Sequence, residues 1–445
     1  MRFLLNLIYL LLIGLTSPWL VYAAVRHGKY REGFGQKILG LVPRRDGDRA
    51  CVWLHAVSVG EVNLLGTLLR EIQRKHPDWQ CVISTTTKTG MEVASRKYSD
   101  HIVFYCPLDF SWAVRNAMRR IRPSMLLLAE LELWPNLIHA AKENNASVAV
   151  VNGRLSENSF RGYRRIRWVV ASLLRKLDLI AVQDQSYADR FVALGAPADR
   201  VVVTGSLKYD GAETDRANLK TQELAALAGF ENGDIVLLAG STQESEEQIA
   251  LETYRQLAEQ HPALRLVLVP RHPERFDAVA RLLDDAGIDW QRRSELPSTA
   301  SLPAARVLLV DTVGELGAWW GTAQIAFVGG SMGKRGGQNM IEPAAFGASV
   351  CFGPNTRNFR DVVTNLMRKG AAVIVRDQQE LTQFVRRSIE SPAFASNLGQ
   401  RARQFVISQL GATERTVAAI DQRSSVPESA AWVEHGDESV VRDAA

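Results

Sequence analysis

The chain has few cysteines, and none of them is paired in sequence. Cys51, Cys81, Cys106 and Cys351 lie far apart in apolar segments, with no C-x-x-C motif. This spacing is typical of buried, reduced thiols in a reducing compartment and argues against a disulfide scaffold. The sequence also has no H-E-x-x-H motif and no paired Cys/His arrangement, which argues against a structural or catalytic zinc site.

Two common phosphate-binding motifs are missing as well. No G-x-G-x-x-G follows the first strand-like segment, and no G-x-x-x-x-G-K-[ST] occurs anywhere. Their absence disfavours a dinucleotide enzyme and a P-loop NTPase. Asp46-Gly47-Asp48 spells the D-x-D of metal-dependent sugar transferases, but it lies in a polar linker rather than after a strand, so we interpret it as a simple turn.

The composition is that of a globular protein with a mild excess of basic residues. The 445 residues are 46% hydrophobic and 23% charged, which suits two domains with a core each. The net charge is +5, and arginines cluster at 119–122 (RRIR) and 161–168 (RGYRRIRW). Two explanations stay open for these clusters: a solvated surface, or attraction to anionic lipid or nucleic acid.

Residues 3–25 form one uncharged apolar run, FLLNLIYLLLIGLTSPWLVYAAV. As a helix this run would extend about 34 Å, enough to span or embed in a bilayer. Basic residues concentrate directly after it, so the positive-inside rule leaves the rest of the chain in the cytoplasm. We therefore expect an uncleaved membrane anchor over residues 1–30. Secretion is the alternative, because Val21-Tyr22-Ala23 resembles a signal-peptidase site.

Beyond the anchor, apolar segments of strand length alternate with amphipathic helical patterns, and this alternation occurs twice. Such a pattern predicts an α/β fold with two doubly wound, Rossmann-like domains whose parallel sheets are covered on both faces. Ligands of such sheets bind at the carboxyl ends of the strands, so we expect a central cleft between the domains. The predicted divisions are a first domain over 31–207, a linker over 208–234, a second domain over 235–420 and a disordered tail over 421–445.

Several loops in the second half place small residues between a strand and a helix. LLAGSTQESEEQ (237–248) and FVGGSMGKRGGQNMIEP (327–343) have glycines whose backbone N–H groups could approach an anion, such as a nucleotide with few phosphates. Arg271 follows another strand and offers a fork of donors to phosphate. Glu342 suits a ribose or caps a helix, and His272 is either functional or a packed turn residue. The segment GELG, with Gly314 and Glu315, also lies between a predicted strand and a predicted helix, but it is weaker evidence for a ligand-binding loop.

In the first half of the chain, carboxylates follow the predicted strands. Glu61 ends the turn HAVSVGE, and Glu130 directly follows the buried strand-like segment 125–129, with Glu132 two residues later. A carboxylate at a strand end can be partly desolvated, which raises its pKa toward that of a usable base. Helix capping or a surface ion pair is the common alternative for each one alone. Lys208 adds a cation that either stabilises a departing phosphate or is simply exposed.

Six motifs, taken in order, resemble one family. HAVSVGE, AELELWPN, TGSLKYD, LVPRHPERF, DTVGEL and GGQNMIEP follow the apolar amino terminus. This series is similar to that of the 3-deoxy-D-manno-octulosonic-acid (Kdo) transferases of lipopolysaccharide synthesis. The resemblance covers about residues 1–410. Gln338 stands where many relatives have histidine, a difference that bears on fine donor specificity.

The resemblance implies a GT-B glycosyltransferase that is inverting, metal-independent and without a cofactor. Its donor would be CMP-Kdo, and its acceptor the lipid A precursor at the cytoplasmic side of the inner membrane, with membrane lipids but no nucleic acid as further partners. Glu61 would be the base, and Glu130 and Lys208 would support the transition state. The CMP contacts would fall on Pro270, Arg271, Val313, Gly314, Glu315, Asn339, Met340, Ile341 and Glu342.

Two other functions remain as alternatives. One is a different sugar-nucleotide enzyme on the same fold, such as a UDP-sugar transferase or an epimerase. The other is a catalytically idle, membrane-attached protein that only binds a sugar nucleotide.

Overall fold

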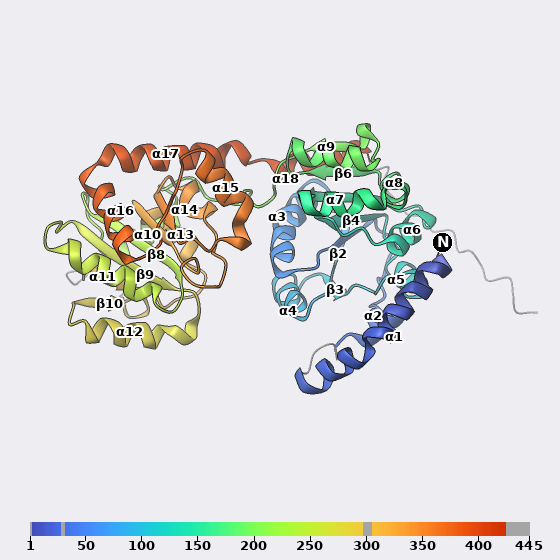
Figure 1. Ribbon diagram of the computed structural model, residues 1–445, viewed down its shortest axis with the longest axis horizontal. Helices are drawn as coiled ribbons and strands as arrows, with labels where there is room; N and C mark the ends of the chain where they lie inside the picture. Colours follow the sequence, from blue (N-terminus) through green and yellow to red (C-terminus); the bar gives the residue numbers. More distant parts are fainter. Residues whose placement is uncertain (1, 28–31, 297–304, 424–445) are drawn as a thin grey trace, which may run out of the picture. The chain divides into compact units, whose positions relative to one another are not determined.

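In a computed structural model the chain forms two compact units (Figure 1), and residues 2–27, 32–296 and 305–423 are described. The first unit comprises residues 1–210 and 411–445, and the second comprises 211–410. Each unit is built around its own parallel sheet of seven strands. The prediction of two doubly wound domains is therefore confirmed.

The first sheet has the strand order β3-β2-β1-β4-β5-β6-β7, with every pair parallel. The strand order reverses between β1 and β4, which are direct neighbours, and such a reversal is where doubly wound sheets bind their ligands. The strands are β1 (Cys51–His55), β2 (Gln80–Thr85), β3 (Ile102–Tyr105), β4 (Met125–Ala129), β5 (Ser147–Gly153), β6 (Leu179–Val182) and β7 (Val201–Val203).

Helices cover both faces of this sheet because its strands are apolar on both sides. All five residues of β1 and of β4 are buried, as expected for a central parallel strand. Two separate apolar clusters, one on each face, contain Trp53 and Leu54 respectively. The helices are α1 (Arg2–His27), α2 (Phe34–Leu39), α3 (Val59–Lys75), α4 (Lys88–Lys97), α5 (Ser111–Ile121), α6 (Pro135–Glu143), α7 (Glu157–Arg165), α8 (Arg167–Leu174), α9 (Gln185–Leu194) and α18 (Ala412–Arg423).

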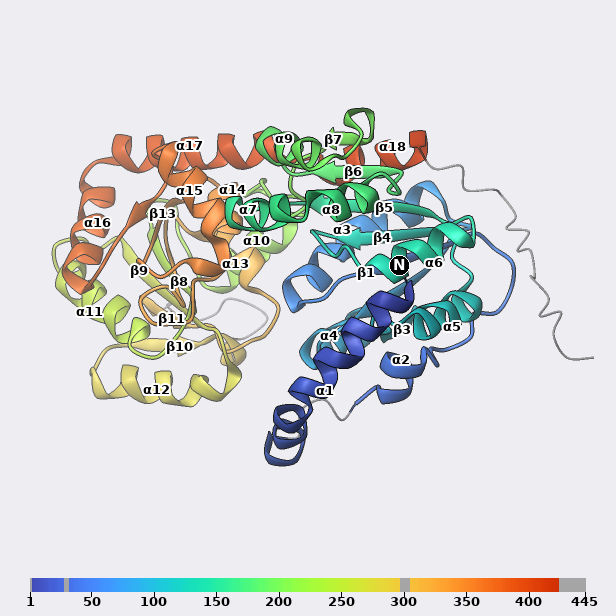
Figure 2. The same ribbon diagram turned by 45° about the vertical axis from the view of Figure 1, so that its right-hand side comes forward.

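The apolar amino-terminal segment forms the helix α1, seen in dark blue in Figure 2. Its polar side chains attach it to the first unit: Asn6 Nδ2 donates to Ser111 Oγ at 2.7 Å, and the Tyr9 hydroxyl donates to Asp109 Oδ2 at 3.0 Å. Leu11 and Leu15 are 64% and 81% exposed. Within the described part of the chain, no helix has the combination of length and hydropathy that crossing a membrane requires.

The second sheet has the order β10-β11-β9-β8-β12-β13-β14, again with every pair parallel. Its order reverses between β8 and β12, so this pair corresponds to β1 and β4 of the first unit. The strands are β8 (Ile235–Thr242), β9 (Leu264–Pro270), β10 (Trp290–Arg292), β11 (Val307–Leu309), β12 (Ile325–Val328), β13 (Ser349–Phe352) and β14 (Val373–Ile374).

The helices of the second unit pack on both faces of this sheet in the same manner. One apolar cluster joins Leu266 and Phe327 of the strands to Leu251 and Leu381 of the helices. The helices are α10 (Leu219–Leu227), α11 (Glu246–Ala258), α12 (Phe276–Asp285), α13 (Leu316–Thr322), α14 (Ile341–Ala345), α15 (Arg360–Arg368), α16 (Gln378–Glu390) and α17 (Pro392–Gln409).

The structure corrects the predicted domain boundaries. Residues 411–423 do not continue the second domain, because α18 returns to the first unit and buries Val417 and Ile420 in the cluster that contains Leu54. The predicted linker 208–234 is divided between the units at Asp210, and its helix α10 packs on α13. The predicted tail 421–445 begins inside α18, and its residues 424–445 lie outside the described part. The predicted cleft between the domains stays a prediction.

Candidate functional site

Glu61 lies where β1 turns into α3, at the order reversal of the first sheet. Ser58 is the N-cap of α3: its Oγ accepts from Glu61 N at 3.3 Å and donates to Glu61 Oε1 at 2.7 Å. Glu61 Oε2 accepts from Val57 N at 2.9 Å. This is a variant of the capping box, in which the carboxylate accepts from the N–H of the residue before the N-cap, so the alternative role of Glu61 as a helix cap is present in the structure. The carboxylate is only half-buried, and each of its oxygens can accept a further hydrogen bond.

Glu130 lies at the carboxyl end of the neighbouring strand β4. Its φ is 57°, a left-handed conformation that is costly for a residue other than glycine and is often found at functional sites. The Glu130 side chain is 14% exposed, and its Oε2 accepts from Arg154 Nε at 2.8 Å. Burial raises the pKa of Glu130, while the charges of Arg154 and Lys208 lower it and that of Glu61 raises it. The charges of Glu61 and Lys208 therefore both act on Glu130.

Glu132 belongs to the same group of charges. Burial raises the pKa of Glu132 to about 7, and the negative charges of Glu61 and Glu130 add to that increase. One of its oxygens accepts from Trp134 Nε1 at 2.9 Å, which opposes the increase. The strand ends at Ala129, so Glu130 and Glu132 lie in the irregular segment that follows it and not in a continuation of the strand.

Two residues of this site were missed by the sequence analysis. Arg154 is the direct partner of Glu130, and Asn152 Oδ1 accepts from Leu207 N at 3.1 Å, which fixes the turn that carries Lys208. Asn152 lies near the carboxyl end of β5 and Arg154 directly follows this strand, which pairs with β4. Their position at the end of a strand in the sequence VNGRL was the available signal, because every parallel strand of one sheet ends at the same edge.

Three predicted donor-binding residues gather in the second unit. Asn339 Nδ2 donates to Glu342 Oε1 at 2.9 Å, and Asn339 Oδ1 accepts from Ile341 N at 3.0 Å. Burial raises the pKa of Glu342, whereas Asn339 and the charge of Arg271 lower it. The exposed Arg271 follows Pro270 at the end of β9, and its backbone N–H donates to Thr242 O at 3.0 Å. A carboxylate, an amide and a guanidinium therefore converge at this strand edge.

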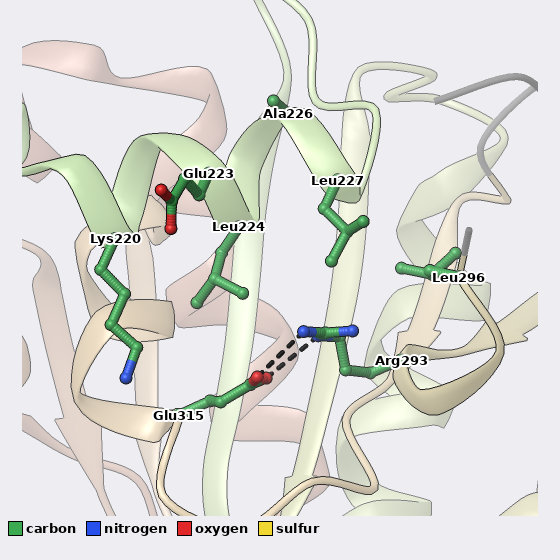
Figure 3. Close-up of a pocket in the computed structure, with 8 residues that line it drawn as sticks. All are labelled: Lys220, Glu223, Leu224, Ala226, Leu227, Arg293, Leu296 and Glu315. Atoms are coloured by element: carbon green, nitrogen blue, oxygen red, sulfur yellow. Dashed lines mark hydrogen bonds and ion pairs between the residues drawn. The ribbon is translucent and has the colours of Figure 1, made fainter. Parts of the chain in front are cut away.

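Glu315 has a different environment, which Figure 3 shows. Arg293 donates to both of its oxygens, from Nη2 at 2.9 Å and from Nε at 3.0 Å. Thr312 Oγ1 and Trp319 Nε1 also donate to Oε2, at 2.7 and 3.3 Å. The Arg293–Glu315 pair lines a pocket of about 540 Å³ together with Leu224, Leu227 and Leu296 and with Lys220, Glu223 and Ala226.

The carboxylate of Glu315 thus has an internal role, and it holds the loop before α13 in place. Val313, in that loop, is 79% exposed, so the loop itself can contact a ligand. Adjacent tryptophans of α13 act on two of the donor motifs, because Trp319 donates to Glu315 and Trp320 lowers the pKa of Glu342. The side chain of Trp320 also lies against Gly240, where an added Cβ would come within 2.5 Å of its ring.

The glycine loops do not offer the free anion-binding amides that the sequence predicted. Glu246 is 1% exposed, and its carboxylate accepts from the backbone N–H groups of Gly330, Ser331 and Met332 at 2.6, 2.9 and 2.9 Å. Gln243 N donates to the same carboxylate at 2.8 Å. The anion that these amides bind is therefore a side chain of the protein itself. For these four amides the prediction was wrong, because an internal glutamate competes for the same donors.

Two remaining predictions concern His272 and metals. The ring nitrogen Nε2 of His272 accepts from Arg335 Nη2 at 3.1 Å, so His272 joins the loop after β9 to the loop after β12. Within residues 2–27, 32–296 and 305–423, no three His, Cys, Asp or Glu side chains are arranged to hold a metal ion. Catalysis without a metal stays a prediction.

Comparisons with known proteins agree with this arrangement. The model of a family described as 3-deoxy-D-manno-octulosonic-acid transferase (kdotransferase) matches residues 30–211. The 3-deoxy-D-manno-octulosonic acid transferase of Haemophilus influenzae is 34% identical over 368 residues, which cover 82% of this chain and 85% of that protein. The corresponding protein of Bordetella pertussis is 34% identical over 382 residues, 84% of this chain and 87% of that one.

A solved structure supports the fold. The UDP-GlcNAc 2-epimerase from Neisseria meningitidis, bound to UDP-GlcNAc, matches with a TM-score of 0.55 at 14% identity and covers 84% of this chain and all of that one. At this identity the likeness concerns the fold alone. It agrees with a GT-B fold of two Rossmann-like domains.

Proposed function

Because the chain belongs to the 3-deoxy-D-manno-octulosonic-acid transferase family and is a Kdo transferase of lipopolysaccharide core synthesis, we propose that it moves Kdo from CMP-Kdo onto the lipid A precursor with inversion at the transferred carbon. The observation that supports this most directly is the group formed by Glu61, Glu130 and Lys208 at the order reversal of the first sheet. A single half-buried carboxylate with spare acceptor capacity is what an inverting transfer requires of its base.

Glu61 is the base of the proposed mechanism. It takes the proton from the acceptor hydroxyl while the oxygen attacks the anomeric carbon of Kdo, and CMP leaves from the opposite face. The half-buried carboxylate is oriented by Ser58 and Val57 N, which hold it in one rotamer before the acceptor binds. No second carboxylate is needed as a nucleophile, because inversion requires a single displacement.

Glu130 and Lys208 support the reaction through charge in this proposal. Glu130 is held by Arg154, and Lys208 contributes a positive charge near Glu130. Fixed charges in a partly desolvated site stabilise a transition state better than mobile water does. With these cations in place the transfer needs neither a metal ion nor a cofactor.

The second unit binds CMP in this proposal. Arg271 pairs with the phosphate, while Glu342 accepts hydrogen bonds from the ribose hydroxyls, with Asn339 orienting its carboxylate. The exposed loop with Val313 and Gly314 contacts the base. The positions of these residues support the assignment of this CMP site. They follow β9, β11 and β12, and parallel strands of one sheet end at the same edge.

We propose further that α1 attaches the protein to the cytoplasmic side of the inner membrane. Asn6 and Tyr9 tie one side of this helix to the first unit, while Leu11 and Leu15 are left exposed, which suits a helix embedded in the membrane interface. The exposed Trp168 follows the basic residues of α7 and adds an interfacial contact.

Flotation with vesicles tests this attachment. Replacing Leu11 and Leu15 together by serine should reduce co-flotation with anionic phospholipid vesicles at least about fivefold. The reason is that two large apolar side chains are lost from the side of the helix that inserts into the membrane in this proposal. Replacing the exposed Leu219 of α10 by serine is the control and should change nothing. Equal flotation of the double variant and the wild type would disprove attachment through α1.

The transfer itself is tested with purified protein, CMP-Kdo and tetra-acylated lipid A precursor. We expect a mass increase of the lipid by whole Kdo units, together with release of CMP. Product from a UDP-sugar, with none from CMP-Kdo, would favour the other sugar-nucleotide enzymes of this fold. Binding of CMP without any product from either donor would favour the idle binder.

A further inference from the structure

A basic pocket lies in the second unit outside the residues discussed so far. It has a volume of about 410 Å³ and is lined by Lys334 from the loop after β12 and by Arg357 and Arg360 from the segment after β13. Gly336, Pro354, Asn355 and Thr356 complete its walls, and none of these seven residues is acidic. Three cations around one hollow without a carboxylate attract an anionic ligand group.

The backbone that carries these cations is fixed by hydrogen bonds between the two loops. Asn358 N donates to Gly336 O at 2.9 Å, and Asn358 Nδ2 donates to Arg335 O at 3.0 Å. Asn355 also donates two hydrogen bonds to the other loop. Its N donates to Ser331 O and its Nδ2 donates to Met332 O, both at 2.9 Å. The cations therefore extend from a preformed platform and not from two independent loops.

Gly336 allows the side chain of Arg357 to approach the backbone of the neighbouring loop closely. Gly336 has a φ of 96°, and an added Cβ would lie 2.6 Å from Arg357 Cγ and 3.0 Å from Arg357 Nε. The side chain of Arg357 thus packs directly on the backbone of the neighbouring loop. This contact limits where the guanidinium can go and so reduces the entropy lost when it binds a ligand.

The pocket is connected to the predicted donor site at two points. Lys334 and Gly336 belong to the same loop as Asn339. Arg335, between them, donates to His272, the residue that follows Arg271. All of these residues lie beyond the carboxyl ends of β9, β12 and β13, at one edge of the second sheet.

We propose that Lys334, Arg357 and Arg360 form a subsite for the carboxylate of the donor sugar. This inference rests on the proposed function: the transferred sugar is an acid, so its donor carries two anionic groups, the phosphate of CMP and the sugar carboxylate. A guanidinium fork matches a carboxylate or a phosphate with two parallel hydrogen bonds. With the CMP phosphate assigned to Arg271, the sugar carboxylate is the anion that remains for this pocket.

The test compares CMP with CMP-Kdo on the full chain. The variants are Arg357→Gln, Arg360→Gln and the double variant, and the matched control is Arg386→Gln, which removes one exposed arginine of α16 in the same unit. Calorimetric titration gives the Kd of CMP and of CMP-Kdo, and steady-state assays give the KM of each substrate. All the replaced side chains are exposed, so melting temperatures should stay close to that of the wild type.

We expect each subsite variant to weaken CMP-Kdo binding about tenfold, and the double variant by more, while CMP binding changes less than about twofold. Equal losses for CMP and CMP-Kdo would overturn the proposal, since the pocket would then hold the nucleotide phosphate. A rise in the KM of the lipid acceptor alone would also overturn it. So would subsite variants that bind CMP-Kdo as tightly as the control Arg386→Gln does.

The titrations do not depend on turnover, so they separate this inference from the proposed function. If wild-type protein binds CMP-Kdo through this pocket but forms no lipid product, the transfer proposal fails and the subsite stands. If product forms normally and the variants bind CMP-Kdo as the wild type does, the subsite fails and the transfer stands.

Discussion

The two sheets reverse their strand order at corresponding places, and each has a glutamate at the start of the helix that follows the central strand. Glu61 follows β1 and is half-buried, with bonds to Ser58 and Val57 N. Glu246 follows β8 and is 1% exposed, with four backbone N–H groups on its carboxylate. The same residue type in the same topological position thus has two opposite environments.

This difference shows what separates a structural carboxylate from a reactive one. The bonds of Glu246 join two loops, Gln243 to Met332, and leave its carboxylate inaccessible to a ligand. Glu61 has near it two other carboxylates, Glu130 and Glu132, whose pKa values its charge raises. Repulsion among three neighbouring carboxylates, of which Glu130 is paired with Arg154, costs stability, and such a cost is common at functional sites.

The largest expected effect is on the stability of the second unit. Replacing Glu246 by alanine leaves four N–H groups without their acceptor, two of them buried and two part-buried, and we expect the free energy of unfolding to fall by at least about 3 kcal/mol. Chemical denaturation followed by tryptophan fluorescence measures this change. Replacing the exposed neighbour Glu244 by alanine is the control and should cost under about 0.5 kcal/mol. If both variants lost a similar free energy of unfolding, Glu246 would not be the structural carboxylate that distinguishes the second sheet from the first.

The next effect is on the rate and concerns Glu61. Glutamine can still serve in a capping box, so Glu61→Gln keeps the helix start while removing the base. We expect turnover to fall at least about a hundredfold, or about 2.7 kcal/mol in the barrier, with CMP affinity nearly unchanged.

The partner of Glu61 in the capping box provides the control for this experiment. Ser58→Ala should lower the free energy of unfolding by about 1 kcal/mol and leave turnover within about tenfold of the wild type. If Ser58→Ala lost as much turnover as Glu61→Gln, the role of Glu61 would be to position the helix and not to accept a proton.

The smallest effect is a pH dependence of stability that comes from Glu132 in the first unit. The pKa of Glu132 is about 7 in the folded protein and 4.5 as an ordinary glutamate, so the folded state binds this proton more tightly. Its contribution to stability is fully present below about pH 4.5 and is lost as the pH rises through about 7. Denaturation curves between pH 4.5 and 8 should therefore show a smaller decline for Glu132→Gln than for the wild type. Parallel declines would mean that Glu132 titrates normally.

Other groups contribute to the same decline, which is why the comparison is made with a variant. Burial raises the pKa of Asp109 to about 6, and burial also raises that of Glu130. Both remain in Glu132→Gln, so only the difference between the two curves reports on Glu132.

The sequence alone predicted most strands and the two sheets, because buried parallel strands are continuous apolar runs. The short strand β10 (Trp290–Arg292) was missed, since a Trp-Gln-Arg segment at the sheet edge has no apolar run. The place of α18 was also missed, because an amphipathic pattern shows that one face is buried but not which sheet buries it.

The predicted site residues were found at strand ends, but their partners were not foreseen. That Glu246 would bind the amides of Gly330 and Ser331 depends on two loops about 85 residues apart in sequence, and no local pattern contains that pairing. The same holds for Arg154 and Glu130, which meet only because β4 and β5 are adjacent. Motifs thus located the site, whereas the role of each side chain followed from its neighbours.

The return of α18 to the first unit has a consequence for synthesis of the protein. Ala412, Val417 and Ile420 cover apolar residues of the first sheet, among them Leu127 and Leu179. The ribosome has made all strands of both sheets before this helix emerges. The amino-terminal unit therefore waits with part of one sheet face uncovered while the second unit, which is continuous in sequence, can already fold.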